Sequence, residues 1–122
     1  MNTSLIIHVL HITIISGLFW YVGLKRNSIP PVMYTGLIGL GFVILFYHLY
    51  KLYLRVMNKQ VPWVNAIHIF VVAPLLLFIG YNRDNTPRYA YELLLMLGFA
   101  SFGYHGMYIL EDMGFWGENN DK

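Results

Sequence analysis

Four long apolar stretches, separated by short polar ones, run through the chain. The first extends from about Leu5 to Leu24 and contains no charged residue. A helix of about 20 apolar residues is long enough to cross a bilayer core of about 30 Å. The other stretches lie at about 30–57, 62–79 and 87–110. The pattern therefore predicts four membrane-spanning helices joined by short connections.

Prolines and glycines mark the expected ends of these helices. Pro31 and Pro87 stand at the starts of the second and fourth helices, where a missing backbone N–H costs little. Gly23 and Gly80 stand near the ends of the first and third helices, where glycine permits the turn. Pro74 lies inside the third helix and predicts a kink there.

The two halves of the chain repeat each other at an offset of 57 residues. The identical pairs include turn residues as well as histidines, which chance matching of two apolar hairpins would rarely align. These pairs are His11/His68, Gly23/Gly80, Arg26/Arg83, Pro30/Pro87, Tyr34/Tyr91, Gly41/Gly98 and His48/His105. We interpret the pattern as a duplicated transmembrane hairpin, with repeats at about 5–57 and 62–114.

The sequence therefore predicts an all-α, integral membrane four-helix bundle, formed as a single four-span domain over residues 1–122. Each hairpin crosses the membrane twice, so both copies enter it in the same direction. A pseudo-two-fold axis along the membrane normal should then relate them.

The composition agrees with a membrane protein and narrows the partners. Hydrophobic residues make up 57% of the chain and charged residues 11%, whereas soluble domains are about 25% charged. The net charge is +2, and the basic residues are spread over several loops, so no nucleic-acid partner is expected. We expect a multi-pass protein in contact with the lipid bilayer, alone, as a homo-oligomer or within a larger membrane complex.

Four histidines carry the candidate chemistry. His11 and His48 are 37 residues apart, and so are His68 and His105. The midpoint of each pair falls at a predicted hairpin turn, and residues equidistant from such a turn lie at the same height. With the two-fold axis, all four histidines are expected in one layer, near the membrane face that carries both termini.

The second helix indicates which way the histidines face. Tyr34, Leu37, Gly41 and His48 are separated by steps of three and four residues or their sum, and so form one stripe. The fourth helix repeats this stripe, which we expect to face the bundle interior. Gly41 and Gly98 would leave space there for a cofactor or let a neighbouring helix approach closely.

Inward-facing imidazoles favour a bound metal or a metal-containing cofactor. Neutral imidazole is the common nitrogen ligand of iron, copper and zinc. A haem b could take its axial ligands from His11 and His68 or from His48 and His105, a layout similar to membrane b-type cytochromes in this general sense. Alternatively, a bare transition-metal ion could bind up to all four histidines. In either case the protein would be a redox protein, such as an electron carrier.

Two other functions are also compatible with the sequence. The histidines could line a path for protons or small solutes in a channel or transporter. They could also hold helices together in a membrane scaffold or assembly subunit. His8, three residues before His11, is expected at the membrane interface or at the mouth of the site, and its equivalent in the second repeat is Asn65. The sequence contains no catalytic triad, phosphate-binding loop or carboxylate pair, so no catalytic residue is assigned.

Overall fold

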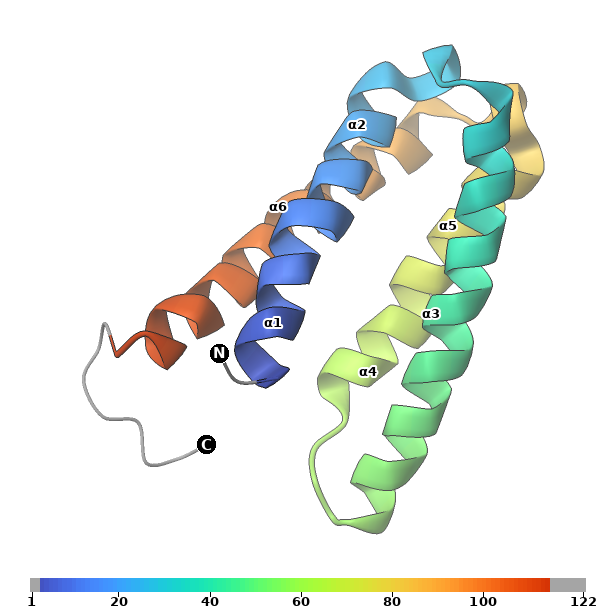
Figure 1. The fold of residues 1–122 in the computed structure, drawn as a ribbon. Coiled ribbons are helices and arrows are strands. Elements are labelled where there is room, and N and C mark those ends of the chain that lie inside the picture. The colour runs from blue at the N-terminus through green and yellow to red at the C-terminus, as the bar shows by residue number, and fades with distance from the viewer. Residues whose placement is uncertain (1–2, 115–122) are drawn as a thin grey trace. The chain divides into compact units, whose positions relative to one another are not determined.

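A computed structural model describes residues 3–114, without the side chain of Ser4. Figure 1 shows the helices, which in chain order are α1 (Thr3–Leu10), the π-helical segment η1 (His11–Ser16), α2 (Gly17–Lys25), the 3₁₀ turn η2 (Arg26–Ser28), α3 (Pro31–Met57), α4 (Trp63–Ile67), the π-helical segment η3 (His68–Val72), α5 (Ala73–Asn82), the 3₁₀ turn η4 (Arg83–Asn85) and α6 (Arg88–Asp112). The described residues contain no strand, and the predicted all-α class is confirmed.

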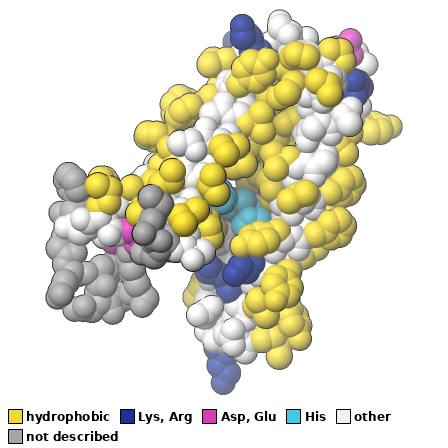
Figure 2. Space-filling model, viewed as in Figure 1, with side chains coloured by type: hydrophobic (Ala, Val, Ile, Leu, Met, Phe, Trp, Pro, Cys, Tyr) yellow, Lys and Arg dark blue, Asp and Glu magenta, His cyan; other side chains and the backbone are white. Residues whose placement is uncertain are grey.

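Four continuous helical stretches are long and apolar enough to cross a membrane. They are Leu5–Ser28, Pro31–Met57, Trp63–Asn85 and Arg88–Asp112, and they correspond to the four predicted spans. Large apolar side chains lie on their outer surfaces, and Phe70, for example, is 73% exposed. Figure 2 shows such side chains covering much of the visible surface. Contact with a lipid bilayer accounts for this exposure.

The helices form two compact units, each of which combines spans from both sequence repeats. The first unit comprises residues 1–25 and 92–122, of which 3–25 and 92–114 are described. The second comprises residues 26–91, and in it α3 packs along α5. Helix packing in each unit thus joins one repeat to the other.

The chain reverses direction at two similar 3₁₀ turns. Each turn begins with an arginine, Arg26 or Arg83, whose φ is 52°. In each turn, the backbone N–H three residues later donates to the carbonyl oxygen of that arginine, with N–O distances of 3.4 and 3.1 Å. The residue with positive φ is therefore an arginine in both turns, whereas the sequence pattern assigned this role to Gly23 and Gly80.

Gly80 instead allows two helices of the second unit to approach closely. It is buried within α5, and a Cβ atom added there would lie 2.8 Å from the carbonyl oxygen of Tyr34 and would also meet Ile38. Only glycine leaves room for the α3 backbone at this distance. The close contact explains a glycine inside a helix, where it is otherwise unfavourable.

A buried tyrosine pair lies near this contact. Tyr34 and Tyr91, which are equivalent in the two repeats, are 3% and 1% exposed, and their hydroxyl oxygens are 3.4 Å apart. The Tyr91 hydroxyl donates to Asn27 Oδ1 at 2.8 Å. Arg83 donates to the carbonyl oxygen of Pro31 at 3.0 Å and lies over the Tyr34 ring. These contacts join the turns at the ends of α3 and α5.

The first and third spans change from α- to π-helical hydrogen bonding at the same place. η1 begins at His11 and η3 begins at His68, which are equivalent residues. Pro74, which lacks a backbone N–H, follows η3, but the corresponding residue after η1 is Gly17. Proline alone therefore does not explain the π-helical turns. Such turns are frequent at functional sites.

The glycine contact predicts the effect of a bulky residue. We expect Gly80→Val to lower the unfolding free energy by about 1–3 kcal/mol, because its side chain would collide with the α3 backbone. The matched control is Gly39→Val in α3, where an added Cβ meets nothing within 4 Å. Unfolding in detergent measures both variants. Equal stability of the two would contradict the close approach at Gly80.

Candidate functional site

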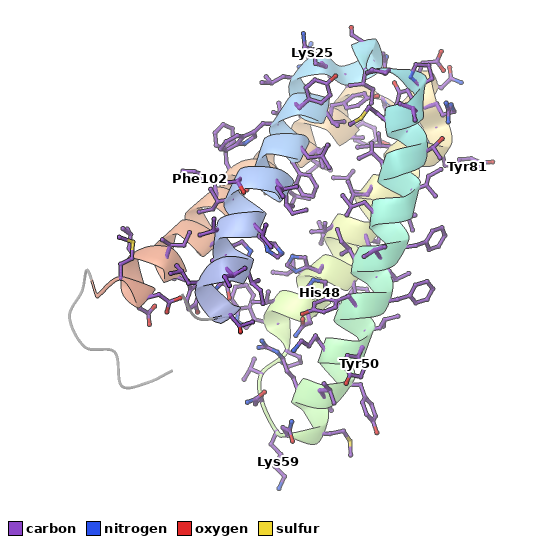
Figure 3. The ribbon with its side chains drawn as sticks, in the orientation of Figure 1. Lys25, His48, Tyr50, Lys59, Tyr81 and Phe102 are labelled. Carbon is purple, nitrogen blue, oxygen red and sulfur yellow. The ribbon has the colours of Figure 1, made fainter. Side chains whose placement is uncertain are left out.

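The second unit contains a stacked pair of histidines. His48 lies on α3 and His68 begins η3; their ring centroids are 4.0 Å apart and the ring planes differ by 14°. Figure 3 shows His48 directed toward α4 and η3. Its Nδ1 lies 2.8 Å from Asn65 Oδ1, and His68 Nδ1 lies 2.7 Å from the carbonyl oxygen of Val64. Both rings thus have an oxygen partner at Nδ1.

The first unit contains a histidine cluster of similar design. The ring centroids of His11 and His105 are 4.4 Å apart, with the planes inclined by 31°. His11 Nδ1 lies 2.8 Å from the carbonyl oxygen of Ile7. His105 Nδ1 lies 2.6 Å from His8 Nδ1, and the His8 ring stacks on Tyr108.

The two histidine pairs make equivalent contacts at the offset of the sequence repeat. His11 and His105 in one unit correspond to His68 and His48 in the other. The partners also correspond, because Ile7 aligns with Val64 and His8 with Asn65. Each pair therefore takes one histidine from each repeat. The common layer for all four histidines stays a prediction.

The hydrogen bonds define which ring nitrogen carries the proton in three of the histidines. A carbonyl or amide oxygen only accepts, so Nδ1 of His11, His48 and His68 must donate. In the neutral ring the lone pair then lies on Nε2, the nitrogen that can bind a metal. For His105 the donor is not defined, because its partner is the Nδ1 atom of His8.

Two members of the site were not among the predicted site residues. His8, expected at the membrane interface or at the mouth of the site, contacts the ring of His105. Asn65, which the sequence offered only as the repeat equivalent of His8, holds His48. Each lies three residues before a predicted site histidine, on roughly the same helix face. That spacing, present in both repeats, is the signal that would have identified them.

Four buried side-chain atoms have no hydrogen-bond partner within the described part of the chain, among them one atom each of Asn65 and Ser16. Asn65 is 3% exposed, and its Nδ2 atom has no such partner. Ser16 is fully buried, and its Oγ atom is also unpartnered. Burying an unpaired amide or hydroxyl is costly. The unpaired Nδ2 atom of Asn65 belongs to the same side chain whose Oδ1 contacts His48.

Gly41 and Gly98, the two glycines predicted at the site, each pack against a side chain of the facing helix. A Cβ atom added at Gly41 would lie 2.9 Å from Leu77, and one added at Gly98 would lie 2.7 Å from Trp20. Leu77 and Trp20 are themselves equivalent in the repeat. Close helix packing thus explains both glycines, and their part in a cofactor site stays a prediction.

The histidine pairs fit some metal-containing groups better than others. Within residues 3–114, no three His, Asp or Glu side chains are grouped as in a closed metal site. Adjacent imidazoles can supply two ligands to an ion that takes its others elsewhere. A haem does not fit between the rings of one pair, because axial imidazoles direct their nitrogens at the iron from opposite sides whereas His48 and His68 are stacked face to face.

The fold and these contacts define a class of protein: a helical protein with four candidate membrane-spanning segments and two histidine pairs. No protein family, curated protein or solved structure matches the chain.

The packing at Gly98 can be tested through Trp20. We expect Gly98→Ala to displace the indole, because the added methyl group would lie 2.7 Å from it, and so to change the Trp20 fluorescence. Gly103→Ala, on the same helix, is the matched control, since its Cβ would meet nothing within 4 Å. Both are measured in a background in which Trp63 and Trp116 are replaced by Phe. An unchanged spectrum for Gly98→Ala would contradict the contact.

Proposed function

We propose that the protein is a multi-pass membrane protein that binds transition-metal ions through its histidine pairs and transfers electrons. The observation that carries this proposal is the hydrogen bonding of Nδ1 in His11, His48 and His68. Metal-binding histidines characteristically donate their other ring N–H to a carbonyl or carboxylate, which fixes the ring and raises the basicity of the ligand nitrogen.

The contacts favour this use of the histidines over helix adhesion alone. His11 and His68 donate to carbonyl oxygens four residues earlier in their own helices. Each of these two hydrogen bonds lies within one helix, so neither of them holds neighbouring helices together. In the neutral rings the lone pair then lies on Nε2, the nitrogen through which we propose that they bind an ion such as copper or iron.

The geometry favours an ion over haem b within each pair. The ring spacing of 4.0 Å in one pair and 4.4 Å in the other leaves no room for a porphyrin between the rings. A haem would have to take an axial ligand from outside the pair. An ion that changes oxidation state, copper or iron, would supply the electron-transfer chemistry, while the histidines bind and orient it.

Metal content and absorption spectra of the purified protein test the proposal. We expect bound copper or iron in the wild type, a partial loss in His11→Ala or His68→Ala, and a complete loss in the double variant. Tyr81→Ala is the control, because Tyr81 is 83% exposed and lies away from His48 (Figure 3). Each single variant removes one ligand of one pair, so their effects should add.

Other outcomes would assign the protein differently. A Soret band that is abolished by either histidine variant would replace the ion with haem b. Colourless protein without metal would overturn the proposal and favour a scaffold or a transporter with a histidine-lined pathway. Proton flux into liposomes, lost when the histidines are replaced, would identify the transporter.

A further inference from the structure

The two histidine pairs differ at one position that contacts them directly. In the second unit this position is Asn65, whose Oδ1 lies 2.8 Å from His48 Nδ1. In the first unit it is His8, whose Nδ1 lies 2.6 Å from His105 Nδ1. The two contacts involve equivalent residues, but an amide and an imidazole impose different demands on the histidine they hold.

The amide oxygen permits one tautomer only. Because Asn65 Oδ1 cannot donate, His48 must carry its proton on Nδ1, and the lone pair of the neutral ring lies on Nε2. Free imidazole side chains in water favour the opposite tautomer, with the proton on Nε2. Asn65 therefore opposes an intrinsic preference. Asn65 itself is buried, with 3% of its surface exposed.

The imidazole of His8 does not restrict His105 to one tautomer. Either ring of the His8–His105 contact can donate, provided that the other accepts. His105 can thus carry its proton on Nδ1 or on Nε2, whereas His48 carries it on Nδ1 alone. The two pairs are alike in position but differ in how strictly they define the ligand nitrogen.

We propose that Asn65 is the positioning residue of the His48–His68 pair and fixes Nε2 of His48 as the nitrogen that binds the metal. The metal-binding consequence rests on the proposed function, whereas the tautomer of His48 does not depend on a bound metal. Asn65 acts through His48 and need not touch the ion.

A packing role for Asn65 predicts a different outcome. Its Nδ2 atom is buried and has no hydrogen-bond partner among the described residues, so the amide is not optimal for stability alone. Replacing it with leucine, which has a similar size, removes that unsatisfied donor. A purely structural asparagine would tolerate this change without any effect on the tautomer of His48 when the fold is retained.

Nitrogen-15 spectra of labelled histidines test the tautomer in metal-free protein in bicelles at pH 8.5. We expect His48 with its proton on Nδ1 in the wild type, and a shift toward Nε2–H in Asn65→Leu. Asn65→Asp should keep the Nδ1–H form, because a carboxylate also accepts. His68 is the internal control, since its partner is the backbone oxygen of Val64 and its tautomer should not change.

The reciprocal substitution tests the same rule in the first unit. His8→Asn supplies there the amide that the second unit already has, and it should bring His105 to the Nδ1–H form. The proposal is overturned if wild-type His48 carries its proton on Nε2, or if Asn65→Leu leaves the tautomer unchanged while the His68 signal shows the fold intact.

A second experiment measures copper affinity by titration, in a His11→Ala background that leaves only the His48–His68 pair complete. We expect Asn65→Leu to weaken binding by about 10–100-fold, as is usual for loss of such a hydrogen bond, and Asn65→Asp to restore it. Unchanged affinity in Asn65→Leu would overturn the positioning role. If the tautomers behave as expected but the wild type binds no metal, the proposed function fails and the assignment of the His48 tautomer stands.

Discussion

Inside a bilayer, every backbone N–H and carbonyl group must find a partner within the protein, and this constraint underlies the whole fold. No water is present to compensate an unpaired group, so a segment that spans the membrane in isolation must be helical. The four apolar stretches meet the requirement as Leu5–Ser28, Pro31–Met57, Trp63–Asn85 and Arg88–Asp112. The described non-glycine residues with positive φ lie near the ends of these stretches or between them, and they are Arg26, Lys59 and Arg83.

The same constraint applies to the histidines, since an imidazole in an apolar environment also needs partners. His11 and His68 use the carbonyl oxygens of their own helices, at the places where α-helical hydrogen bonding gives way to π-helical turns. His48 and His105 instead use side chains from a neighbouring helix. The result is two pairs of adjacent rings, in which hydrogen bonding determines the protonated nitrogen of His11, His48 and His68. This determination links the membrane fold to the proposed metal chemistry.

Helix packing and the histidine contacts depend on each other through the glycines. Gly41 and Gly98 lie on the same helices as His48 and His105, and each receives a side chain from the helix that carries the other histidine of its pair, Leu77 or Trp20. Close approach at the glycine brings the two rings of a pair within contact distance. Bulkier residues there would separate the helices and so the rings. The equivalence of these contacts in the two units supports an origin by duplication, which we retain as an interpretation.

The sequence by itself determined the number of candidate spans and the positions of their ends to within a few residues. It also identified the four histidines as the candidate site residues. These are local properties: apolar length is set by the bilayer thickness, and the repeat is visible in the residues themselves. Only the tertiary structure decided that each pair joins His11 with His105 or His48 with His68, and that His8 and Asn65 belong to the pairs. Helix pairing depends on which side chains fit against which glycines across long sequence separations, and periodicity along a single helix does not contain that information.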